Sequence, residues 1–199
     1  MKTISTIILT CLVGFFLTSC KSILVPLSGL KQPKLESIKS VSDYLEKKKI
    51  EQYDTLYICP DSAALYTLMF KIKDFPRTIL FDRNDVSVLQ SDSGYCPGKA
   101  ELFMRNLSLS TSLRSDDRFS MKEIFQWVHP VVWNSETTQD PDFTLFVFWA
   151  KYCGSLNNSV FRVMKGIQEN PNIKTRIYLV NIDFMDSWDL KSKPEFTFK

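Results

Sequence analysis

The residues that could carry chemistry in this 199-residue chain are a few cysteines and one histidine. After position 20 the cysteines are Cys59, Cys96 and Cys153, and three thiols cannot all pair within one chain, so one thiol is left over. His129 is the only histidine and stands beside Pro130, which favours a helix-end residue over a catalytic base. Because no short pair of cysteines or histidines has the spacing of metal ligands, we expect neither a metal nor a cofactor.

Cys153 stands out because of its neighbours in the sequence. It follows the almost wholly apolar run FTLFVFWA (143–150), which is typical of a strand buried on both faces. It precedes NNSVFRVMKGIQEN (157–170), in which apolar residues recur at helical spacing. The central question of the sequence is therefore whether a cysteine at this strand-to-helix junction performs thiol chemistry.

The elements that would position this cysteine alternate along the chain. We expect helices over residues 40–50, 61–72, 97–107, 120–128 and 157–170, and strands over residues 54–59, 143–150 and 175–184. Residues 77–90 are expected to form a hairpin that turns at Asn84–Asp85, and residues 108–118 a polar surface loop. This alternation predicts an α/β fold with a mixed sheet flanked by helices on both sides.

Residues 143–183 resemble the thioredoxin family. In that family a buried strand ends in Phe-Trp-Ala, a Cys-Gly-Pro-Cys motif follows at a helix N-terminus, and the next strand ends in a similar Asn-Ile-Asp. The matching residues here are Phe148-Trp149-Ala150, Tyr152, Cys153-Gly154 and Asn181-Ile182-Asp183. The resemblance implies a thioredoxin-like fold in which Cys153 is a candidate nucleophile. It also implies a lowered pKa for this thiol, because free N–H groups and the helix dipole would stabilise the thiolate.

Three departures from the family pattern fall on residues that run its chemistry. Leu156 stands where the second, resolving cysteine would be, Ser155 replaces the proline between the cysteines, and Val147 replaces the buried acid. The family's cis-proline, which faces the cysteine, corresponds to Pro194 or Pro76. Because residues 75–107 look like the family's terminal hairpin and helix, we expect an N-terminal extension or a rearranged strand order.

Cys59 has two interpretations. Cys59-Pro60-Asp61-Ser62 resembles a Cys-x-x-Ser monothiol site, but a buried cysteine before an Asp-capped helix is the favoured interpretation. Cys96 is the best candidate partner for a disulfide with Cys59.

The N-terminal residues predict an address in the cell envelope. Residues 1–19 read as a signal peptide whose end, Leu17-Thr18-Ser19, resembles the bacterial lipobox and precedes Cys20 as the lipid-attachment residue. Residues 20–39 are expected to be a tether that packs loosely on the domain, which covers residues 40–199. This organisation predicts a bacterial lipoprotein that is attached to a membrane through Cys20 and faces the periplasm or the cell exterior.

Charge excludes one class of partner. The formal net charge is +3, and the run Lys47-Lys48-Lys49 stands beside Glu46 and Glu51, as on a solvated helix face. We therefore expect no binding to nucleic acid.

The leading hypothesis is a membrane-anchored, thioredoxin-like interaction module with a single candidate thiol, which binds a protein partner in the envelope and is not an enzyme. The alternative is a thiol-disulfide oxidoreductase that uses Cys153 as nucleophile and Cys96, Cys59 or an external thiol as resolver. A third interpretation is an unrelated α/β lipoprotein, such as an immunity protein for a secreted factor.

Overall fold

The computed structural model of the chain describes residues 29–88, 97–113, 115–134, 138–190 and 194. The predicted signal peptide, the predicted lipid-attachment residue Cys20 and the candidate disulfide residue Cys96 lie outside the described residues.

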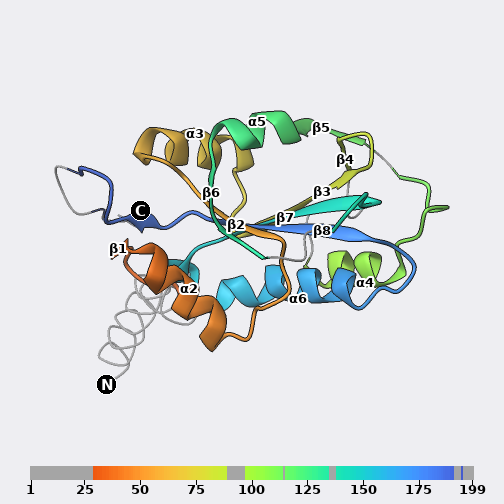
Figure 1. Cartoon of the computed structure of the whole chain (residues 1–199), viewed down its shortest axis with the longest axis horizontal. Coiled ribbons are helices and arrows are strands. Elements are labelled where there is room, and N and C mark those ends of the chain that lie inside the picture. Colours follow the sequence, from red (N-terminus) through yellow and green to blue (C-terminus); the bar gives the residue numbers. More distant parts are fainter. Residues whose placement is uncertain (1–28, 89–96, 114, 135–137, 191–193, 195–199) are drawn as a thin grey trace, which may run out of the picture.

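Helices and strands alternate through most of the described chain (Figure 1). The helices are α2 (Ile38–Lys47), α3 (Ser62–Ile72), α4 (Pro97–Asn106), α5 (Met121–Gln126) and α6 (Asn157–Gln168), with a 3-10 turn, η1 (Lys151–Leu156), directly before α6. The strands are β1 (Leu35–Glu36), β2 (Thr55–Ile58), β3 (Arg77–Asp82), β4 (Val86–Val88), β5 (Ser115–Ser120), β6 (His129–Trp133), β7 (Phe143–Trp149), β8 (Thr175–Asn181) and β9 (Phe184–Met185).

The main sheet is mixed, and β7 lies at its centre. Among the described residues its strand order is β5-β4-β3-β7-β8-β2-β6. β7 pairs parallel with β8 and antiparallel with β3, and β2 pairs parallel with β8 on the far side. The short strands β1 and β9 form a separate parallel pair. The predicted α/β fold with a mixed sheet is thus confirmed.

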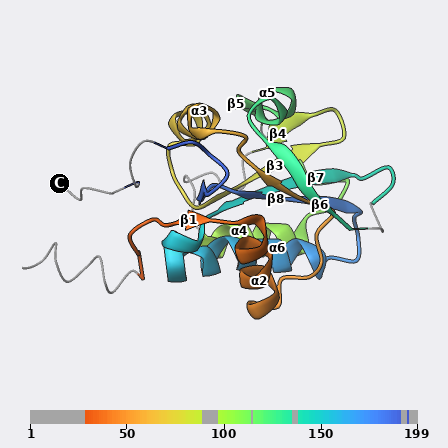
Figure 2. The same cartoon turned by 60° about the vertical axis from the view of Figure 1, so that its left-hand side comes forward.

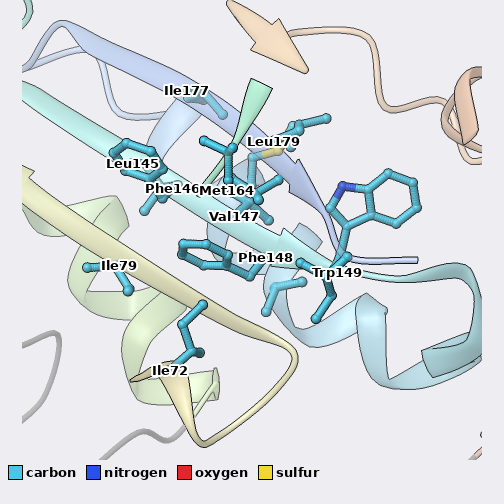
Figure 3. Packing of buried hydrophobic residues seen from close by; sticks show 14 of the residues in the cluster. Ile72, Ile79, Leu145, Phe146, Val147, Phe148, Trp149, Met164, Ile177 and Leu179 are labelled. Atoms are coloured by element: carbon cyan, nitrogen blue, oxygen red, sulfur yellow. The ribbon is translucent and has the colours of Figure 1, made fainter. Parts of the chain in front are cut away.

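Helices cover both faces of this sheet (Figures 1 and 2). α3 and α5 lie on one face, and α2, α4 and α6 lie on the other. Every residue of β7 is buried, as expected for a strand whose two faces both pack against helices. Figure 3 shows side chains of β3, β7 and β8 packed together with Met164 of α6 and Ile72 of α3.

Two strands of the main sheet were not predicted, and both are edge strands. β5 occupies part of the expected surface loop and pairs with β4, with Ser115 opposite Val88 and Ser120 opposite Val86. β6 pairs antiparallel with β2, and it contains Pro130, which has no N–H to donate and is therefore tolerated only on an edge. The prediction that His129 ends a helix is wrong, since α5 ends at Gln126 and His129 begins β6.

Residues 29–39, the last part of the predicted tether, are not loosely packed. Pro33 is buried and Leu30 packs against the core. β1 pairs with β9, and α2 begins at Ile38, with the Ser37 side chain accepting a hydrogen bond from Ser40 N. The folded body therefore includes residues 29–39.

Candidate functional site

The candidate site lies at the edge of the sheet where three parallel strands end. In the strand register Trp149 of β7 lies opposite Asn181 of β8, which in turn lies opposite Ile58 of β2. Because the carboxyl ends of parallel strands meet at one edge, the segments that follow them gather there. This edge carries Cys59 after β2, the Cys153 turn after β7 and Asp183 after β8.

Cys153 lies in the 3-10 turn η1 and not on the first turn of α6. Its backbone N–H donates to the carbonyl oxygen of Ala150 at 3.0 Å. Gly154, within η1, takes a φ of 53° and a ψ of −121°, which makes a kink directly after Cys153, and α6 begins at Asn157. Cys153 therefore precedes both the kink and α6, so it does not lie on the first turn of the helix, where the dipole argument for an activated thiol would place it.

The environment of the Cys153 thiol favours its protonated form. The residue is 2% exposed. Burial, together with a smaller effect of the nearby Asp183 carboxylate, raises the pKa of the thiol to about 12. The expectation of a lowered pKa at Cys153 is wrong, because desolvation outweighs any helix-dipole effect at this position.

The buried Asp183 carboxylate is hydrogen-bonded to the first residue of the turn η1. One of its carboxylate oxygens accepts from Lys151 N at 2.8 Å and from the side-chain amide of Asn181 at 2.7 Å. The Asp183 N–H donates to Asn181 Oδ1 at 3.2 Å, so the two residues bond to each other in both directions. Burial raises the pKa of Asp183 to about 6, and the hydrogen bonds from Lys151 and Asn181 oppose this shift. The motif Asn181-Ile182-Asp183 thus stabilises the start of η1.

A second support comes from Asn157 and Tyr44. The Asn157 side chain is fully buried and its amide donates to the carbonyl oxygen of Ala150 at 2.7 Å and to the Tyr44 hydroxyl at 3.3 Å. The Tyr44 ring stacks on Trp149, with ring centroids 5.3 Å apart. Sequence reasoning missed both residues as parts of this site. They come from two helices far apart in the chain, and no local pattern links them.

Lys151 contributes a largely buried ion pair. Its ammonium group contacts the carboxylate of Glu36 and the hydroxyl of Ser40, and the Lys151 and Glu36 side chains are 22% and 13% exposed. The pair connects the start of η1 with β1 and α2. This link was also absent from the sequence-based expectations.

The residues that depart from the family pattern lie as follows. Leu156 is half-buried and packs against the core, Ser155 is exposed, and Val147 is fully buried in β7. Two apolar side chains, Leu156 and the buried Val147, therefore occupy the positions where a dithiol centre would need its second thiol and its acid.

The two candidate cis-prolines lie in different settings. The Phe75–Pro76 peptide bond is cis and directly precedes β3, and the Phe75 ring lies 6.4 Å from that of Tyr152 between centroids. Pro194 is half-buried, and the residues on both sides of it lie outside the described residues.

Cys59 is a buried thiol before a capped helix, as the favoured interpretation predicts. It is 1% exposed, and the Asp61 carboxylate caps α3 by accepting from Ala64 N at 2.8 Å. Burial raises the pKa of Cys59 to about 12. Both Cys59 and Cys153 are free thiols in the structure, and the pairing of Cys59 with Cys96 stays a prediction.

No group of three or more His, Cys, Asp or Glu side chains within the described residues is placed to hold a metal ion. None of the helices in the described part of the chain has the length and apolar character needed to cross a membrane.

Comparison of the chain with protein-family models, with curated proteins and with solved structures found no match. What the site can do chemically therefore follows from its own geometry. The site contains a buried, protonated thiol on a turn that is hydrogen-bonded by Asp183 and by Asn157.

Proposed function

We propose that the chain is a thioredoxin-like interaction module of the bacterial cell envelope, attached to a membrane through a lipid on Cys20. In this proposal the strand-turn-helix around Cys153 serves as a scaffold, and dithiol turnover is absent. The partner is a protein in the envelope.

The arrangement of strands around β7 supports the thioredoxin-like part of the proposal. β7, η1, α6 and β8 follow one another in the order that the family uses around its cysteine. β3 lies antiparallel beside β7 and follows the cis-proline Pro76. β4 and α4 come next, and α4 packs on α6 so closely that a Cβ at Gly166 would lie 3.0 Å from the carbonyl oxygen of Glu101. Here this hairpin and helix precede β7 in the chain, so we propose a rearranged version of the family's sheet.

The burial of Cys153 carries the functional part of the proposal. A nucleophilic thiol needs access to its substrate and a thiolate at working pH. Cys153 is 2% exposed and its pKa is raised to about 12, so it meets neither condition as it lies in the structure. Leu156 supplies no thiol to resolve a mixed disulfide.

A disulfide-reduction assay tests this proposal. We expect a disulfide-bonded protein substrate to be reduced no faster by dithiothreitol with the purified chain than by dithiothreitol alone. The reason is that the Cys153 thiol is closed and lacks a resolving partner. The control is Cys153→Ser, which should behave identically to the unchanged chain.

Capture in intact cells extends the test. Amine-reactive crosslinking should recover the same envelope partners with Cys153 and with Cys153→Ser. Catalysed reduction, or a disulfide-linked partner, that is lost in Cys153→Ser would contradict the proposal and support the thiol-disulfide oxidoreductase.

A further inference from the structure

The segment Gly29–Glu36, here called the strap, lies against the Cys153 turn. The N–H of Lys31 donates to the carbonyl oxygen of Tyr152 at 2.8 Å. At its end, Leu35 and Glu36 pair with Phe184 and Met185 of β9, close to Asp183 in the chain. The strap is thus bonded both to the turn and to the segment that supports the turn.

Two glycines bring the strap and the turn into backbone contact. Gly29 and Gly154 have φ values of 71° and 53°, a region in which side chains are unfavourable. A Cβ at Gly154 would overlap the carbonyl oxygen of Gly29, and a Cβ at Gly29 would lie 2.6 Å from Ser155 Oγ. No space for a side chain remains between the two segments, so the backbones of the strap and the turn are in direct contact next to Cys153.

The ion pair between Glu36 and Lys151 fixes the strap on the other side of Cys153. Both side chains are largely removed from water, so separating them in place would leave a charge without its partner. The strap therefore contacts the chain at Lys151 and Tyr152 before Cys153 and at Gly154 and Ser155 after it.

The attachment of the strap is nevertheless limited. Within the described part of the chain β1 has two residues and pairs only with β9, whereas β2, which precedes Cys59, pairs with both β6 and β8. Leu35 is 41% exposed. Segments with few buried contacts and few backbone hydrogen bonds open locally at a lower free energy than core strands.

We propose that the strap is a releasable cover on the Cys153 turn, which closes the thiol when seated and exposes it when displaced. This inference depends on the contacts of the strap alone and would stand if the proposed function failed.

Alkylation of the native chain tests this proposal, with Cys59 as an internal reference. The purified chain is treated with iodoacetamide at pH 8, and labelling of Cys153 and Cys59 is followed separately by mass spectrometry of their peptides. Two variants act on the strap and leave the turn unchanged in sequence. Gly29→Ala places a methyl group against Ser155, and Glu36→Gln removes the charge that pairs with Lys151.

We expect both variants to label Cys153 at least ~10-fold faster than the unchanged chain, with Cys59 labelling within about twofold, because only local opening is affected. Two controls should match the unchanged chain. Gly98→Ala adds a methyl group where no atom lies within 4 Å, and Lys34→Gln changes one charge on an exposed strap residue.

Two results would overturn the strap as a local cover. One is unchanged Cys153 labelling in both variants. The other is a parallel rise at Cys59 and Cys153 in both variants, which would mean that the thiols become accessible only when the whole domain unfolds.

Discussion

Replacing Phe146 by alanine is expected to lower the free energy of unfolding by about 3–5 kcal/mol. Phe146 is fully buried at the centre of β7. Its ring lies 5.6 Å from that of Phe81, 5.5 Å from that of Phe125 and 5.2 Å from that of Tyr178, measured between centroids. These rings come from β3, α5 and β8, so the truncation would leave a cavity where three elements meet.

Denaturant unfolding followed by circular dichroism measures this loss. The matched control is Phe70→Ala, since Phe70 lies on α3 and is 81% exposed. This control should stay within about 0.5 kcal/mol of the unchanged chain. Should Phe146→Ala fail to fold, Phe146→Leu gives a smaller loss that can still be measured. Equal effects at positions 146 and 70 would contradict the position of β7 at the centre of the core.

The second large effect is a dependence of stability on pH through Asp183. Its pKa is raised from 3.8 to about 6 in the folded chain, chiefly by burial. The folded state therefore binds a proton between these two pH values more readily than the unfolded chain does. The stabilisation from that proton is fully present below pH 3.8 and is lost as the pH rises through about 6.

This pKa difference corresponds to about 3 kcal/mol, of which about 2–3 kcal/mol falls between pH 7 and pH 4. Asp183→Asn is the reference because an amide does not titrate. The free energy of unfolding of the unchanged chain, minus that of Asp183→Asn, should rise by this amount when the pH is lowered from 7 to 4. Other carboxyl groups cancel in this difference. A difference that stays constant, or falls, would show that Asp183 is not held in a desolvated site.

Much of the fold could be predicted from periodicity and turn chemistry. The run FTLFVFWA predicted a strand buried on both faces, and every residue of β7 is buried. The turn at Asn84–Asp85 joins β3 to β4, and the Asp82 carboxylate fixes it by accepting from Asn84 N and Val86 N. In these segments the local pattern and the tertiary environment favour the same structure.

The unpredicted strands depend on pairing partners that lie elsewhere in the chain. β6 has only five residues, includes a proline and is bonded on one side to β2, with a register shift between Leu56 and Tyr57. An edge strand of this kind has no strong period of its own.

The location of the site could be predicted, but the burial and the protonation of its thiol could not. Cys153 follows β7 as the resemblance implied, but its pKa depends on burial, and that burial depends on distant residues. The strap and Tyr44 lie outside the residues that carry the resemblance, and Asp183, which lies within them, raises the pKa of Cys153. The contact between Gly29 and Gly154 is the clearest example of such a long-range dependence. A glycine in the sequence does not reveal which other segment its backbone will contact.

The central claim is that Cys153 is a closed and protonated thiol. The most direct test is the rate of its alkylation at pH 7 in the native chain, divided by the rate in the same chain unfolded in urea. A free thiol has a pKa near about 8.5, so a pKa of about 12 reduces the thiolate fraction by roughly three orders of magnitude. We predict a native rate at least ~100-fold slower than the unfolded rate. A native rate equal to or faster than that of the unfolded chain would mean an exposed, activated thiolate and would contradict this account.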